Sequence, residues 1–113
     1  MDLHTVTITS NGVPAPPAIQ VFTGDIVAFV ADNTDAVLCF DMAGLFGMYR
    51  YEIPNGTTLP LVVIAVVEVA TPVAYTVKTN LGAECFPRST NEGTITVLSD
   101  DDREEKPSSG GGD

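Results

Sequence analysis

The sequence lacks tryptophan, has one histidine (His4) and two cysteines, and carries only five lysines and arginines in 113 residues. A single histidine leaves no Ser/His/Asp set and no histidine-rich metal triad. No phosphate-binding loop or HExxH motif is present either, so the sequence does not predict an enzyme. The shortage of basic residues argues against binding to nucleic acids or to anionic membrane surfaces.

Long apolar runs are also absent. The most apolar window covers residues 59–67 and ends at Glu68, well short of the roughly 20 residues that a membrane-spanning helix needs. No basic and apolar leader precedes the first predicted strand, although the Met-Asp start is equally compatible with a removed leader. We expect a soluble chain without membrane insertion, and two cysteines do not fix its compartment.

Acidic residues dominate the charge. Fifteen aspartates and glutamates give a formal net charge of −10. Nine of them, with three bases, lie in residues 1–98, and the other six, with two bases, lie from Ser99 onward. The segment 99–113 has no apolar side chain to bury. We therefore predict one folded domain over residues 1–98 and a disordered acidic, Ser/Gly-rich tail over residues 99–113.

Short β-strands are the expected elements, because eight prolines and ten glycines interrupt a chain that is 44% hydrophobic. The alternation in LHTVTITS predicts a first strand over residues 3–10 with Val6 and Ile8 inward. A turn with Gly24 at positive φ is expected after the second strand. The dipeptide Thr71-Pro72 is expected to end the strand predicted over residues 59–69. The remaining predicted strands cover residues 19–22, 26–31, 36–40, 59–69, 73–79 and 93–98. Seven or eight strands at this spacing are typical of an antiparallel β-sandwich.

The segment 42–51, MAGLFGMYRY, is ambiguous, because two glycines and mixed spacing suit a loop or a single helical turn. Its apolar side chains either cover an open edge of the sandwich or form an exposed patch for a protein partner or a second subunit. These side chains are Leu45, Phe46, Met48, Tyr49 and Tyr51.

Three stretches together resemble the cupredoxins, the single-domain Greek-key sandwiches of blue copper proteins. The first is V-T-I-T-S-N-G at residues 6–12, and the second is I-x-V-x-x-G-D-x-V-x-F at residues 19–29. The third covers residues 75–97, where Y-x-V, Cys85 and G-x-I-x-V follow one another. The resemblance extends over residues 3–98. It implies an all-β, cupredoxin-like Greek-key β-sandwich with a ligand loop between the last two strands.

The copper ligands that the resemblance implies are degenerate. A type 1 copper site needs two imidazoles, one thiolate and a weak axial ligand such as methionine. Cys85 stands at the thiolate position, but Cys39 fills the position of the first histidine, Arg88 that of the second and Gly93 that of the methionine. His4 is the single histidine of the chain, so no histidine follows it. Its place on the first predicted strand favours an ordinary role at the surface or at a sheet edge. We therefore expect no copper cofactor.

Cys39 and Cys85 leave three alternatives open. If the resemblance holds, they replace two groups that share one metal ion, and their side chains are then close enough for a disulfide. They are otherwise two inert buried thiols. The third alternative is a soft-metal site for Cu(I) that includes Met42 or Met48.

Arg88 follows Cys85 in the same predicted loop, in a chain that is short of bases. Beside a free thiol, its charge would lower the pKa of that thiol. We expect instead that Arg88 pairs with an acid, either Glu84 or Glu92.

The function predicted from these features is that of a non-enzymatic cupredoxin-like domain, which acts as a binding or structural module without type 1 copper. The alternative is a copper-binding or electron-transfer protein with an atypical site on Cys39, Cys85 and Met42. A Cys39–Cys85 disulfide would favour an extracytoplasmic location, because such bonds persist in oxidising compartments.

Overall fold

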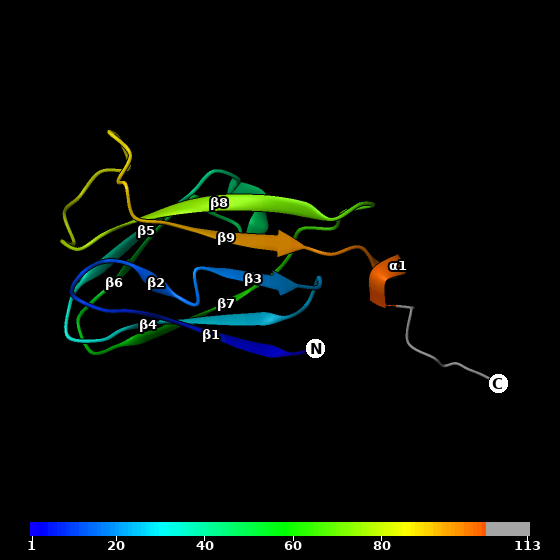
Figure 1. Ribbon diagram of the computed structural model, residues 1–113, viewed down its shortest axis with the longest axis horizontal. Coiled ribbons are helices and arrows are strands. Elements are labelled where there is room, and N and C mark those ends of the chain that lie inside the picture. The colour runs from blue at the N-terminus through cyan, green and yellow to red at the C-terminus, as the bar shows by residue number, and fades with distance from the viewer. Residues whose placement is uncertain (104–113) are drawn as a thin grey trace.

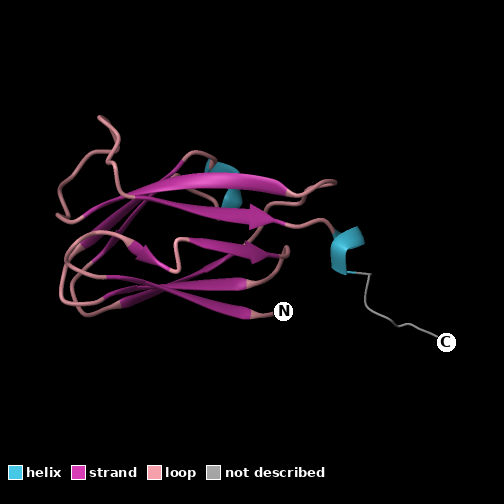
Figure 2. Ribbon diagram, in the orientation of Figure 1, coloured by secondary structure: helices cyan, strands magenta, loops and turns pink. Residues whose placement is uncertain are grey.

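The computed structural model describes residues 1–103, which fold into two packed β-sheets (Figures 1 and 2). The predicted all-β sandwich is confirmed, with nine strands in the described residues instead of seven or eight. They are β1 (Leu3–Ile8), β2 (Pro14–Ala15), β3 (Ala18–Val21), β4 (Ile26–Ala31), β5 (Ala36–Phe40), β6 (Arg50–Ile53), β7 (Thr58–Val62), β8 (Thr71–Lys78) and β9 (Glu92–Val97).

Two short helical pieces complete the described chain. A 3-10 turn, η1 (Ala43–Leu45), lies between β5 and β6, and α1 (Asp100–Arg103) follows β9. No helix within residues 1–103 is long and apolar enough to cross a membrane. Of the tail predicted to be disordered, residues 104–113 lie outside the described part of the chain.

The chain passes repeatedly from one sheet to the other. The first sheet has the strand order β2-β1-β4-β7, and the second has the order β3-β9-β8-β5-β6. β1 runs parallel to β4 and β3 runs parallel to β9, whereas the other neighbours are antiparallel. In this arrangement β8 is the central strand of the second sheet, and β7 is an edge of the first.

Aliphatic and aromatic side chains fill the space between the sheets, in a chain without tryptophan. Val6 and Ile8 face inward with no exposed surface, as predicted. The Tyr75 ring lies 5.8 Å from the Phe29 ring and 5.1 Å from the Phe40 ring, centroid to centroid, in edge-on and tilted contacts. These geometries are the favourable ones for aromatic pairs. Burial also raises the pKa of Tyr75, so its phenol stays neutral inside the core.

The strand predicted over residues 59–69 is wrong beyond Val62. β7 ends there because Val62 lies opposite Ile26, the first residue of its partner β4. The next residues bond to the turn that precedes β4. Gly24, at the predicted positive φ, donates its N–H to the Val63 carbonyl, and the Val63 N–H donates to the Asp25 carbonyl. The segment 63–70 therefore continues without a strand partner, and it bends at Glu68 and Val69.

The break predicted at Thr71-Pro72 is also wrong, since both residues belong to β8. At this end β8 pairs with β9, where Pro72 lies opposite Thr96. Its other neighbour, β5, reaches only as far as Tyr75. Proline is tolerated in a strand where one side has no partner, because its missing N–H then costs no ladder bond on that side.

The segment 42–51 is divided between a helical turn and a strand. The helical turn is present as η1, but the last two residues belong to β6. Leu45, Phe46 and Tyr51 are buried in the core, as in the first of the two alternatives above, in which these side chains cover part of the sandwich. Of the five apolar side chains, only Met48 and Tyr49 are exposed, each by 56%.

Candidate functional site

A disulfide joins Cys39 in β5 to Cys85 in the loop 79–91, which connects β8 to β9. It is the first of the three alternatives above, and it links Cα atoms 5.7 Å apart. Phe40, the next residue of β5, faces the main core, whereas Cys39 belongs to a separate small cluster with Val37 and Cys85. Because side chains alternate along a strand, the disulfide lies on the outer face of the second sheet and holds the loop against it.

Arg50 is the second anchor of this loop. From β6 its guanidinium donates to the carbonyl of Ala83 through Nε (3.2 Å) and Nη2 (2.7 Å), and Nη2 also reaches the carbonyl of Leu81 at 3.1 Å. The same Nη2 lies 2.8 Å from Glu52 Oε2, which neutralises part of its charge. A planar cation thus holds two loop carbonyls, a role that the sequence reasoning did not find.

Lys78 and Arg88 also form hydrogen bonds at this loop, so all three bases of residues 1–98 take part in holding it. Lys78 Nζ donates to the carbonyls of Glu84 and Pro87. Arg88 Nη1 lies 2.6 Å from Asp41 Oδ1, and its Nη2 lies 3.4 Å from Glu92 Oε2.

The predicted pairing of Arg88 is confirmed for Glu92, but its shorter contact, to Asp41, was missed. The hydrogen bond and the charge of Asp41 raise the pKa of Arg88 above its usual value. Asp41 comes directly after β5, 47 residues before Arg88, and no local spacing connects two such residues.

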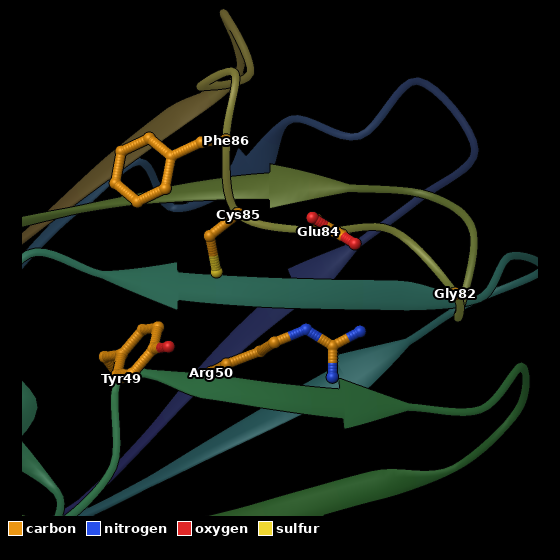
Figure 3. Close-up of a pocket in the computed structure, with 6 residues that line it drawn as sticks. All are labelled: Tyr49, Arg50, Gly82, Glu84, Cys85 and Phe86. Atoms are coloured by element: carbon orange, nitrogen blue, oxygen red, sulfur yellow. The ribbon is translucent and has the colours of Figure 1, made fainter.

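An open pocket of about 430 Å³, lined in part by Cys85, lies beside the disulfide. In Figure 3, Tyr49 and Phe86 lie on either side of Cys85, and the Arg50 guanidinium extends away from the two rings. Tyr49 is 56% exposed and Phe86 is 71% exposed. The pocket is lined by Tyr49, Arg50, Gly82, Glu84, Cys85 and Phe86. Two exposed aromatic rings at the rim of a pocket form a surface suited to contact with another molecule.

The positions assigned to degenerate copper ligands have different surroundings in the structure. Cys39 is in the disulfide, and Arg88 is on the surface with its two acids. Gly93, in β9, lies opposite Tyr75 of β8, and the two are so close that a Cβ on residue 93 would overlap the tyrosine ring. Met42, of the alternative Cu(I) set, packs against the main core and is not in the cysteine cluster.

His4 has a role that the sequence reasoning did not predict. Its Nε2 lies 3.0 Å from Asp25 Oδ2, and Asp25 is 1% exposed. The carboxylate also accepts the N–H groups of Asp2 and Phe22, each at 2.9 Å. Burial by itself raises the pKa of Asp25, but these hydrogen bonds and His4 lower it below its usual value. The pair fixes the start of β1 against the turn before β4.

The fold is similar to that of solved copper proteins. The reduced Cu(I) form of an amicyanin mutant at pH 4 is 18% identical, with a TM-score of 0.55, and the match covers 83% of this chain and 80% of that one. The reduced state of another amicyanin mutant is 16% identical with a TM-score of 0.56 and the same coverage. The fold is cupredoxin-like. No family model and no curated protein matches the sequence.

The side chains of this cupredoxin-like fold do not fit a type 1 copper centre. Such a centre needs a thiolate and two imidazoles, but both sulfurs are bonded to each other, and the chain has one histidine. That histidine lies in β1 of the first sheet, bonded to Asp25, while the disulfide is on the second sheet. Within residues 1–103, no three His, Cys, Asp or Glu side chains gather as a metal site.

Proposed function

We propose that this chain is a non-enzymatic cupredoxin-like domain that works without type 1 copper, as a binding or structural module. The Cys39–Cys85 disulfide is the observation that carries this proposal. It removes the thiolate that a copper site of this fold would use and turns the loop 79–91 into a fixed surface. Tyr49 and Phe86, the exposed aromatic side chains that line the pocket beside it, are the contact face that we assign to a partner.

The bond also supports an extracytoplasmic location, since disulfides persist in oxidising compartments. The alternative function, copper binding or electron transfer on Cys39, Cys85 and Met42, requires reduction of the disulfide. It further requires Met42 to leave its place against the main core.

Thiol counting and copper titration test the proposal. The protein is purified without reductant and alkylated, and its mass is expected to show no modified cysteine. Adding Cu(II) should then produce no intense thiolate-to-copper absorption band, and metal analysis after dialysis should find no stoichiometric copper. A band with one copper per chain would overturn the proposal. Anaerobic titration of the reduced protein with Cu(I), with a Cys39→Ala/Cys85→Ala variant as the control, measures any Cu(I) site on the two thiols.

A further inference from the structure

The segment that follows β7 exposes an unusual amount of aliphatic surface. Val62 and Ile64 are 49% and 53% exposed, and Val66 and Val69 are 79% and 70% exposed. Val63 and Ala65 are buried and alternate with the exposed residues 62, 64 and 66, so this part of the backbone keeps one face on the core and turns the other outward. Val69 lies in the bend that follows at residues 68 and 69. We call the four exposed side chains, Val62, Ile64, Val66 and Val69, the valine edge. An exposed apolar strip of this kind marks an interaction surface more often than chance.

The backbone of the same segment has unused hydrogen-bonding groups. Its first part is tied down, because Ile64 N–H donates to the Leu45 carbonyl at 2.9 Å and the Ala65 carbonyl accepts the Thr23 hydroxyl at 2.6 Å. Residues 66–69 make no backbone–backbone hydrogen bond with any described residue, and the Val69 carbonyl accepts the Thr71 hydroxyl at 2.8 Å. The main-chain groups of Val66, Val67 and Glu68, just before and at the start of the bend, can bond to another extended segment.

Acidic residues border the valine edge. An open pocket of about 450 Å³ is lined by Val66, Val67, Glu68, Ser99, Asp100 and Asp101. The loop 79–91 lies at the opposite end of the long axis of the molecule (Figure 1). The hydrogen bonds and ion pairs of Arg50, Lys78 and Arg88 are made at that end. The surface therefore combines aliphatic side chains with a net negative charge.

We propose that the valine edge binds an extended basic segment of another protein, which lies along residues 66–69. Apolar side chains of that segment cover Val66 and Val69. Its lysines or arginines face Glu68, Asp100 and Asp101. Hydrogen bonds from its main chain to Val66, Val67 and Glu68 add affinity, and its side chains provide specificity.

Charge decides among the possible occupants. A second copy of this chain would bring another net charge of −10 to the same surface, and like charges facing each other oppose association. Nucleic acids and anionic lipids are repelled for the same reason. A cationic protein segment is attracted, and it also neutralises the acids beside the edge. This proposal concerns a different surface from the disulfide pocket and does not depend on the function proposed above.

Three synthetic ten-residue peptides test the proposal against the full chain labelled with ¹⁵N. One alternates lysine and valine, one alternates lysine and serine, and one alternates glutamate and valine. The Lys/Val peptide is expected to shift the amide signals of residues 62–69 and 99–101 and to slow hydrogen exchange at residues 66–69. We expect the Lys/Ser peptide to bind about tenfold more weakly, which corresponds to about 1.4 kcal/mol, and the Glu/Val peptide not to bind.

A Val66→Thr/Val69→Thr variant should weaken binding of the Lys/Val peptide about tenfold. Both side chains are exposed, so urea denaturation should show unchanged stability. Val13→Thr, at a residue 45% exposed elsewhere, is the matched control and should bind as the parent does. Signal shifts confined to residues outside 62–69 and 99–101, equal binding of the Glu/Val peptide or no effect of the double variant would overturn the proposal. A dimer in sedimentation that loses its stability in the double variant would instead assign the edge to a second copy.

Discussion

Two irregular segments flank β8, and they are held to the sandwich by different means. The loop 79–91 is polar. It is attached by one disulfide and by Arg50, Lys78 and Arg88. The segment 63–70 is apolar, and burial of Val63 and Ala65 holds it, with a few hydrogen bonds to its first residues.

The difference shows how side-chain chemistry decides what a loop can expose. A polar loop buries too little apolar surface to offset the entropy of ordering it, so it needs a covalent bond and charged donors. An apolar segment gains stability from every second side chain and leaves the alternate ones facing solvent. The loop 79–91 is a fixed surface around a disulfide, whereas the segment 63–70 leaves aliphatic side chains exposed to solvent.

The largest effect is expected from breaking the covalent attachment of the loop. Cys39→Ala with Cys85→Ala should lower the free energy of unfolding by about 4 kcal/mol, because the bond closes a loop of 46 residues in the unfolded chain. Urea denaturation with and without reductant measures this loss. Reductant should destabilise the parent and leave the double variant unchanged. Equal stability of the variant and the oxidised parent would show that the other anchors suffice.

A second test weakens the hydrogen bonds of the Asp25 side chain, which belongs to the turn that is bonded to the segment 63–70. Asp25→Asn should cost about 2 kcal/mol at pH 7, because a buried carboxylate that accepts two backbone N–H groups loses its charge. The pKa of Asp25 is lower in the folded state than in the unfolded state. Its contribution is therefore complete above the unfolded pKa of about 4 and is lost as the pH falls through the folded pKa.

The pH dependence of that variant provides the check. The stability difference between parent and Asp25→Asn should be largest near neutral pH and should shrink below about pH 4. Asp35→Asn is the matched control, because Asp35 accepts one backbone N–H, that of Asn55, at an exposed position. A difference that does not change between pH 7 and pH 3 would contradict the role assigned to the carboxylate.

The smallest effect is expected from the charged anchors of the loop. Arg50→Gln should cost about 1–2 kcal/mol, since charge-assisted bonds to two backbone carbonyls are lost. Arg88→Gln should cost less, because its pairs with Asp41 and Glu92 are on the surface and screened by solvent. Thermal denaturation compares the two, and hydrogen exchange should show faster exchange in the loop for Arg50→Gln alone. A larger loss for Arg88→Gln would reverse this ranking.

Several elements could be predicted because local patterns specify them. The alternation around Val6 and Ile8 and the glycine turn at Gly24 are both present. The end of β7 at Val62 and the place of Pro72 inside β8 could not be predicted in this way. They depend on where β4 and β5 begin and end, and neighbouring strands are far apart in the chain.

The candidate site was predicted in part. The disulfide was one of the alternatives that followed from the cupredoxin resemblance, and Glu92 was one of two acids expected to pair with Arg88. The contacts of Arg50 and Lys78 with backbone carbonyls could not be predicted from the sequence. Every residue has such a carbonyl, so the sequence does not indicate which ones accept a hydrogen bond. His4 and Asp25, which the parallel register of β1 and β4 brings together, could not be predicted as a pair either.

The sequence by itself determined that this chain is an acidic β-sandwich with one histidine and two cysteines, because composition and period-2 alternation are local properties. Only the tertiary structure decided which face of the sheet carries the disulfide and which side of the segment 63–70 meets solvent. Both depend on strand register, which pairs residues far apart in the sequence. The metal loop that the resemblance implied is, in the structure, a loop held on the outer face of the second sheet by Cys85 and the bases around it.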